Sequence, residues 1–295
     1  MTTAAQWWGG ARPRTLPAAI APVLIGTALA GADWIPLRAL LALVVALALQ
    51  VGVNYANDYS DGIRGTDAER VGPIRLVGQG LATPTSVRNA AFGSFGVAAV
   101  AGLALVTISG YWWLLAVGAA SIAAAWFYTG GKRPYGYVGL GEVFVFVFFG
   151  LVPVLGTMYV QVGRVDFAAV LASLGVGALI CAILVTNNLR DIPTDRESGK
   201  RTLAVRLGDH RTRVLYTTLV IAAFVVIIAM SFLGGQAEPW VLVGLAALPW
   251  ALQPLRIVLS GTQGPGLIPA LVATGRLVIV YAIALSTGLV LRLFL

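Results

Sequence analysis

The sequence predicts an all-α membrane protein with about nine transmembrane helices around a central cavity that opens to the cytoplasmic side. Hydrophobic residues make up 58% of the 295 residues, and charged residues make up only 11%. The mean hydropathy is +0.86, and apolar runs of roughly the 20 residues that a membrane-spanning helix needs recur along the chain. We therefore expect one transmembrane domain over residues 1–295 and no soluble domain.

Nine apolar segments account for the nine expected helices. Pro17 and Pro22 interrupt the first segment, and the connections after the odd-numbered segments contain few charged residues. The connections after the second and sixth segments carry most of the acidic residues instead. The expected helices are residues 16–31, 37–57, 88–109, 112–129, 139–160, 167–189, 211–233, 239–259 and 267–293.

Lys and Arg residues are divided unequally between the two sides of this arrangement. Sixteen of the 20 lie at the N-terminus and in the connections after the second, fourth, sixth and eighth segments, whereas Arg38, Arg164 and Arg292 lie on the other side. The positive-inside rule then places the N-terminus and these connections in the cytoplasm and the chain in the cell membrane. The basic residues behind the net charge of +8 set the orientation in the membrane and contact membrane lipid or an anionic substrate. Nucleic acid is therefore not an expected partner.

Eight of the 12 acidic residues gather in two of the cytoplasmic connections. If the second helix continues through its connection, Asn54, Asp58 and Asp61 lie on one face at i, i+4 and i+7. The second cluster repeats this chemistry at i, i+4 and i+8. Its members are Asn187, Asp191 and Asp195.

Two matched sets of oxygen ligands favour Mg²⁺, which keeps several waters and bridges a few carboxylates to phosphate oxygens. The expected partner is therefore a diphosphate, held between two four-helix halves with the ninth helix appended. The alternative for each cluster is a solvated helix end that pairs with neighbouring arginines.

Basic residues near the two clusters are candidates for the rest of an anion site, because guanidinium and ammonium groups match diphosphate oxygens. Arg276 lies inside the last apolar segment, where a charge is costly unless it faces a polar cavity, so we expect it to point toward the cytoplasmic opening. The other candidates are Arg75, Lys132, Arg133, Lys200 and Arg201.

The residues so far allow two other classes of protein. The sequence DYSDG imitates the start of the DxxDG motif of CDP-alcohol phosphotransferases, although IRGTD follows it. A transporter with an anion site at its cytoplasmic opening is the non-enzyme alternative. The opposite side offers it no polar path, since its connections contain only Asp33, Arg38, Arg164, Asp166 and Glu238.

Five segments resemble the UbiA superfamily of intramembrane aromatic prenyltransferases. NDYSDGIRGTD (57–67) looks like the first aspartate-rich motif, and RDIPTDRESGKRTLAVRLG (190–208) looks like the second. The spacing of the first motif is similar to that of the menaquinone-pathway branch. So are three further segments, ARPRTLPAAIAPVLIGTALA (11–30), GPIRLVGQGLATP (72–84) and YTGGKRPYGYVGLGEVFVFVFFGLVPVLGT (128–157).

The resemblance implies Mg²⁺-dependent transfer of a polyprenyl group from polyprenyl diphosphate to 1,4-dihydroxy-2-naphthoate, with loss of the carboxylate and formation of demethylmenaquinone. 4-Hydroxybenzoate is the alternative acceptor. The ligands of metal and diphosphate are then Asp58, Asp61, Asp191 and Asp195, supported by Asn54, Asn187 and Asp67.

The resemblance also assigns roles to the basic and aromatic residues. Lys132 and Arg133 correspond to a basic pair near the diphosphate, and Arg75 to a clamp on it. An allylic cation formed on loss of diphosphate needs aromatic faces beside it, for which Tyr128, Tyr135, Tyr137 and Phe149 are candidates. Glu142 is expected to orient the acceptor. Cys181, the single cysteine, is expected to be a core residue.

Overall fold

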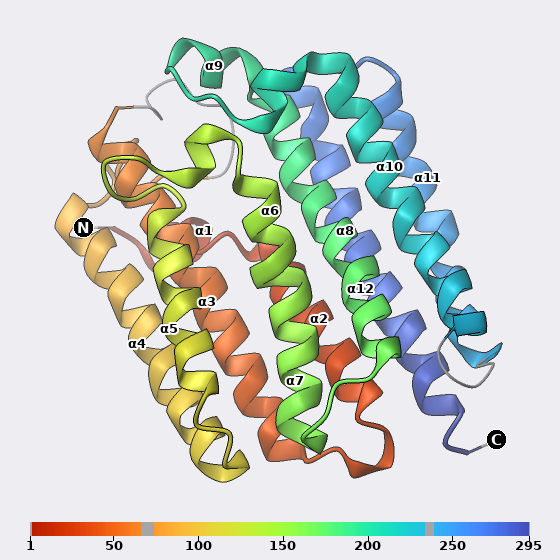
Figure 1. Ribbon diagram of the computed structural model, residues 1–295. Helices are drawn as coiled ribbons and strands as arrows, with labels where there is room; N and C mark the ends of the chain where they lie inside the picture. The colour runs from red at the N-terminus through yellow and green to blue at the C-terminus, as the bar shows by residue number, and fades with distance from the viewer. Residues whose placement is uncertain (1, 66–73, 234–238, 295) are drawn as a thin grey trace.

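The computed structural model describes residues 2–65, 74–233 and 239–294, and these residues form helices and no strand. Figure 1 shows long helices side by side in one bundle, with the connecting segments at its two ends. Seven helical stretches are long and apolar enough to cross a membrane. The predicted all-α membrane fold is confirmed.

The long helices lie close to the expected ranges, and two shorter apolar helices fill the other two. The long stretches are α3 (Pro36–Ile63), α4 (Pro84–Ser109), α6 (Gly141–Val145) with η4 (Phe146–Leu151) and α7 (Val152–Val162), α8 (Phe167–Arg190), α10 (Leu203–Leu233), η5 (Pro239–Ala247) with α11 (Leu248–Leu259), and η6 (Gly264–Leu267) with α12 (Ile268–Leu291). The shorter ones are α2 (Pro17–Leu29) and α5 (Leu114–Phe127).

Short elements connect them at the ends of the bundle. They are α1 (Ala4–Gly10), η1 (Pro13–Thr15), η2 (Gly31–Asp33), η3 (Tyr135–Val138) and α9 (Ile192–Glu197). Figure 1 shows α9 and the segment before α6 at the same end of the bundle, which is also the end where α3 finishes.

Local sequence explains where the helices depart from the expected boundaries. α3 continues six residues beyond position 57, so that Asp58 and Asp61 are helical as their predicted face requires. α4 begins earlier than expected because the side chain of Thr83 accepts a hydrogen bond from the Ser86 amide and Pro84 occupies the first helical position. α10 also begins earlier, with a break at Gly208, whose φ of 76° favours glycine.

α8 lies at the centre of the larger hydrophobic core. Of its apolar span 78% is buried, against 28% for α3. α8 packs against α10, α12 and η4. α12 also contacts α2, so the last span joins the two ends of the chain into one bundle. The expectation that the ninth helix is an appendage is therefore wrong, because its inner face is needed to bury α2 and α8.

A π-helical turn, η4, interrupts the stretch from α6 to α7. Gly150 in this turn lies so close to α8 that a Cβ atom at its position would be 2.6 Å from the Cα atom of Gly177. Small residues allow such close approach of two membrane helices. The turn positions the side chains that precede and follow it along the cavity described below.

Arg38 ties helices together at the opposite end of the bundle. Its guanidinium group donates to the carbonyl oxygen of Val160 at 2.8 Å and to that of Ile108 at 3.0 Å. These carbonyls belong to the last turns of α7 and α4, which have no partners within their own helices. Arg38 therefore supplies donors to two helix ends at once.

Candidate functional site

A cavity of about 950 Å³ runs along the inside of the bundle. α3, α4, α5, α7 and α8 contribute most of its wall, together with α6, η4 and the segment from Gly9 to Thr15 before α2. One end of the cavity is polar, and the remainder is lined by aliphatic and aromatic side chains down to Leu105, Leu114 and Val160. The shape suits a ligand with a polar head and a long apolar tail.

The polar end of the cavity is formed where the two acidic motifs meet. The first motif contributes Asn54, Asn57 and Asp61 from α3. The second contributes Asn187, Asn188 and Arg190 from the last turn of α8, then Asp195, Lys200 and Thr202. The structure thus brings together segments that the sequence separates by more than 130 residues.

A buried ion pair joins the two motifs. Lys200 Nζ lies 3.2 Å from Asp61 Oδ1, and both side chains are almost fully buried. The hydroxyl of Tyr137 donates to the same carboxylate oxygen, and Lys200 Nζ is 4.6 Å from the centre of its ring. A buried charge needs such partners, so Asp61, Lys200 and Tyr137 hold one another in position at the wall of the cavity.

Asp58 does not line the cavity. Its two oxygens accept hydrogen bonds from the backbone amides of Leu76 and Val77, at 2.7 and 3.1 Å. This fixes the segment that carries Arg75, a buried side chain that does line the cavity. In the structure Asp58 therefore acts on the site through the position of Arg75.

Asp191 is paired with its neighbour Arg190. The Arg190 Nε atom lies 2.7 Å from Asp191 Oδ1, and Nη2 lies 2.8 Å from Oδ2. The same Nη2 atom donates to Asn187 Oδ1 at 2.7 Å. Arg190 rather than Asp191 lines the cavity, and it links the asparagine and the aspartate of the second motif.

Glu142 lies behind the cavity wall, at the start of α6. Its Oε1 atom accepts a hydrogen bond from Asn188 Nδ2 at 3.0 Å, and Asn188 lines the cavity. The thiol of Cys181, buried as predicted, donates to the backbone oxygen of Glu142 at 3.2 Å. Any influence of Glu142 on a ligand therefore passes through Asn188.

Four of the predicted basic residues lie outside the cavity. Lys132 and Arg133 are exposed on the turn after α5, and Arg201 is exposed beside Lys200. The turn after α5 is held from α3 by Arg64, which donates to the backbone oxygens of Thr129 and Gly131. Arg276, on α12, is exposed and does not line the cavity, and its direction toward the cytoplasmic opening stays a prediction.

One predicted ligand, Asp67, lies outside the described residues. Of the other expected residues, Asn54, Arg75, Tyr128, Asn187, Asp195 and Lys200 line the cavity with Asp61.

The N-terminal turn, residues 11–15, contributes to the cavity two arginines that the sequence predicted only as signals of membrane orientation. Arg12 and Arg14 line the polar end, and Arg12 has a φ of 54°, a left-handed conformation that is uncommon outside glycine. Among the described residues five cations line the cavity, namely Arg12, Arg14, Arg75, Arg190 and Lys200, against the carboxylates of Asp61 and Asp195. This excess of positive charge suits an anion of high charge.

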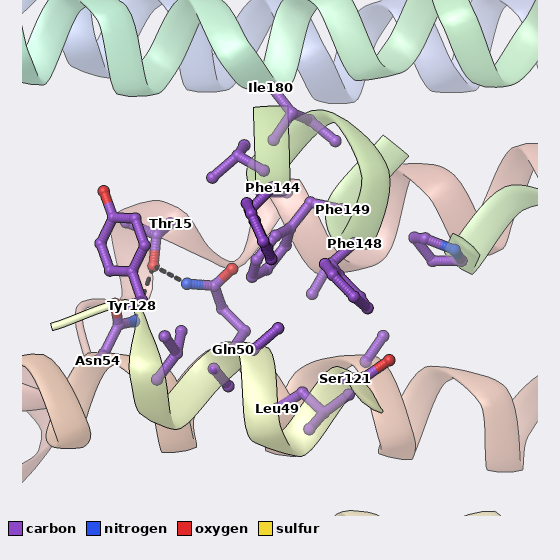
Figure 2. Close-up of a pocket in the computed structure, with 18 of the residues that line it drawn as sticks. Thr15, Leu49, Gln50, Asn54, Ser121, Tyr128, Phe144, Phe148, Phe149 and Ile180 are labelled. Atoms are coloured by element: carbon purple, nitrogen blue, oxygen red, sulfur yellow. Dashed lines mark hydrogen bonds between the residues drawn. The ribbon is translucent and has the colours of Figure 1, made fainter. Parts of the chain in front are cut away.

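An aromatic wall follows the polar end. The rings of Tyr135 and Phe144 stack with their centres 4.0 Å apart, and the ring of Phe148 follows at 6.0 Å from that of Phe144. The Tyr135 hydroxyl donates to the backbone oxygen of Ala124, and burial raises the pKa of this phenol above its ordinary value. The phenol therefore stays neutral. Figure 2 shows Tyr128, Phe144, Phe148 and Phe149 around the pocket.

The donors at the polar end fit a hard cation that is shared with a ligand. No group of three or more acidic, histidine or cysteine side chains that could hold a metal occurs in the described parts of the chain. Carboxylate oxygens of Asp61 and Asp195 and the amides of four asparagines, Asn54, Asn57, Asn187 and Asn188, are present. Mg²⁺ commonly takes one or two carboxylates, several waters and substrate phosphate oxygens. The residues fit such a site and do not form a complete protein cage.

Comparison with protein families gives a match to the UbiA prenyltransferase family over residues 19–266. A curated protein of Mycobacterium tuberculosis, named 1,4-dihydroxy-2-naphthoate octaprenyltransferase, is 56% identical over 98% of each chain. A protein of the same name from Escherichia coli is 39% identical over 91% of this chain and 89% of its own.

Solved structures of distant relatives share the fold. A UbiA homologue from Archaeoglobus fulgidus, solved with DMAPP and Mg²⁺, has a TM-score of 0.70 at 14% identity and covers 95% of this chain and 98% of its own. The apo structure of a homologue from Aeropyrum pernix has a TM-score of 0.67 at 17% identity, with 95% and 96% coverage.

Proposed function

The chain belongs to the UbiA prenyltransferase family, and from this premise we propose that it transfers a polyprenyl group from polyprenyl diphosphate to 1,4-dihydroxy-2-naphthoate. The acceptor loses its carboxylate, and the product is demethylmenaquinone. The relatives from two bacteria that carry the corresponding name support this acceptor. The observation that carries the proposal is the junction of the two acidic motifs, Asp61 with Lys200, at the cation-rich end of a long apolar cavity.

The diphosphate belongs at the polar end. Guanidinium groups match its oxygens in pairs, and Arg12, Arg75 and Arg190 line this end together with Lys200. Their excess of charge opposes the negative charge that grows on the leaving group as the allylic C–O bond breaks. The polyprenyl tail then follows the apolar wall toward Leu105 and Val160.

Mg²⁺ is the proposed cofactor. It was present with DMAPP in the Archaeoglobus structure, and the oxygen donors of Asp61 and Asp195 fit it here. When bound, it would neutralise diphosphate charge. Asp58, Asp67 and Asp191 stay predicted ligands, and Asp58 and Asp191 hold Arg75 and Arg190 in the present arrangement.

The aromatic wall protects the reacting centre. Tyr135, Phe144 and Phe148 are uncharged and place their aromatic rings next to the polar end. Such faces attract an allylic cation and exclude the water that would capture it. The electron-rich ring of the acceptor is then the nucleophile nearest to the cation.

The far end of the cavity does not favour transport. Its lining is apolar, and Arg38 bridges the ends of α4 and α7 there. Around Leu105, Leu114 and Val160 the described lining residues offer a polar headgroup no polar side chain. The site thus suits an enzyme that receives and releases its ligands on one side.

We propose that the polar end faces the cytoplasm, because the basic connections lie at the same end. In a Cys181→Ala background, a cysteine at exposed Ser198 should react with a membrane-impermeant maleimide in inverted vesicles only. A cysteine at exposed Ala32, in the turn between α2 and α3, should react in right-side-out cells only. The reverse pattern would overturn the orientation.

Product analysis tests the function. Purified protein with Mg²⁺ and a polyprenyl diphosphate should consume 1,4-dihydroxy-2-naphthoate in the presence of an equal amount of 4-hydroxybenzoate, and mass spectrometry should show a prenylated naphthalene product. Prenylated 4-hydroxybenzoate as the main product would replace the proposed acceptor, and the absence of any prenylated product would reject the enzyme.

A further inference from the structure

Gln50 is a polar residue in the middle of an apolar helix and has no role in the site described so far. It lies one helical turn before Asn54 on the inner face of α3, lines the cavity, and is 5% exposed. The sequence around it, VALALQVGV (45–53), is otherwise apolar. A polar side chain at this depth in a membrane protein is costly unless it has a partner.

The hydrogen bonds around Thr15 determine how the Gln50 amide is turned. Thr15 Oγ1 donates its single hydrogen to the backbone oxygen of Arg12 at 2.9 Å. It can therefore only accept from Gln50, and Gln50 Nε2 lies 3.0 Å from it. Asn54 Nδ2 donates to the same hydroxyl at 3.0 Å. This network directs the amide oxygen of Gln50 away from Thr15, and Figure 2 shows the amide turned toward Phe144 and Phe149.

The amide oxygen lacks a donor in the parts of the chain that the structure describes. This oxygen faces the cavity, among aromatic rings and aliphatic side chains, and polar atoms kept from water almost always have a partner. An apolar space beside aromatic side chains, with one acceptor atom turned into it, suits an aromatic ring that carries a hydroxyl group.

Only one of the two proposed substrates can supply that hydroxyl. A polyprenyl tail has no donor, and an ionised diphosphate has acceptor oxygens only. Gln50 also lies 11 residues from Asp61 along α3, which corresponds to about 16 Å at the rise of an α-helix. With the diphosphate held against Asp61 and Lys200, Gln50 lies beside the space where the tail begins.

We propose that Gln50 binds the aromatic acceptor, with its amide oxygen accepting a hydrogen bond from an acceptor hydroxyl and the ring lying against Phe144 and Phe149. This inference rests on the proposed function and deepens it. Arg14 lies on the same turn as Thr15, lines the cavity, and complements the carboxylate of this acceptor in charge.

The test compares acceptors with and without each hydroxyl. For the wild type and for Gln50→Leu, we would measure the Michaelis constant for the dihydroxynaphthoate acceptor and the inhibition constants for its two monohydroxy analogues, 1-hydroxy-2-naphthoate and 4-hydroxy-2-naphthoate. In the wild type, removal of the contacted hydroxyl should weaken binding about tenfold or more, because it leaves a buried acceptor without a donor. In Gln50→Leu, the same removal should change binding less than about threefold, and the Michaelis constant for polyprenyl diphosphate should stay the same.

Ser121→Ala is the matched control. Ser121, on α5, also lines the cavity, but its hydroxyl donates to the Val117 backbone oxygen of its own helix at 2.8 Å. This variant should discriminate between the acceptors as the wild type does. Gln50→Met, an unbranched replacement, repeats the measurement if Gln50→Leu does not fold.

Wild-type discrimination in both Gln50 variants would overturn the inference, as would equal loss of discrimination in Ser121→Ala. Failure of the wild type to prenylate any naphthoate would instead reject the proposed function, so the two failures are distinguishable.

Discussion

The motifs contain buried and exposed basic residues, and Lys200 and Lys132 are an example of each. Lys200 is 5% exposed and paired with Asp61 on the wall of the cavity. Lys132 is exposed on the turn after α5. A preorganised charge inside a water-poor site stabilises a developing charge far more than a solvated one does.

Replacement of Lys200 by Gln should therefore lower turnover about 10²-fold or more, whereas Lys132→Gln should change it less than about twofold. Steady-state rates at saturating acceptor check this prediction, with gel filtration showing that both variants are folded. A comparable loss in Lys132→Gln would show that the turn after α5 reaches the diphosphate. Arg201→Gln, exposed beside Lys200, is a second control and should behave as Lys132→Gln does.

The π-helical turn η4 is the element that shapes the acceptor side of the cavity. Phe144, Phe148 and Val152 line it at four-residue spacing. This spacing drifts by about 40° per turn on a regular α-helix, and the wider turn compensates part of that drift. Gly150 allows the turn to lie directly on Gly177 of α8.

Gly150→Ala should destabilise the protein by about 1–3 kcal/mol, because its Cβ atom would overlap the backbone of α8. Gly96→Ala is the matched control, since a Cβ atom at this helical position meets no atom within 4 Å. The control should be neutral or more stable, as alanine favours helix by up to about 1 kcal/mol. The stability of both variants is measured as the fraction of protein that stays monodisperse after heating in detergent. Equal stability of Gly150→Ala and the wild type would contradict the close contact.

At the scale of the whole molecule, the sequence was most informative about what is periodic or repeated. Apolar segments of bilayer length located the long helices. The spacing of Asn54, Asp58 and Asp61 predicted a shared face, of which Asn54 and Asp61 line the cavity, whereas Asp58 binds backbone amides beside it. Because the two acidic clusters have similar chemistry, they were expected to lie together around one diphosphate. These features depend on local pattern, which a sequence displays directly.

Features that depend on tertiary contact were not predictable. Burial separates Lys200 from Lys132 and Arg201, and the sequence shows all three only as charges beside a motif. Arg12 enters the cavity because Asn54 holds the N-terminal turn through Ala11 and Thr15. Gln50 did carry a signal, since it is a polar residue one turn before Asn54 in an apolar run, and that signal went unused.

In the proposed enzyme, one cavity holds an allylic diphosphate at its cation-rich end and a carboxylated aromatic ring beside it. Attack must then occur at the ring carbon that bears the carboxylate, so that prenyl transfer and loss of CO₂ happen together. The decisive measurement uses 1,4-dihydroxy-2-naphthoate labelled at its carboxyl carbon. Labelled CO₂ should appear in equal molar amount to the prenylated product, and only when Mg²⁺ and polyprenyl diphosphate are both present. Retention of the label in a prenylated naphthoate, or release of CO₂ without polyprenyl diphosphate, would contradict attack at this carbon.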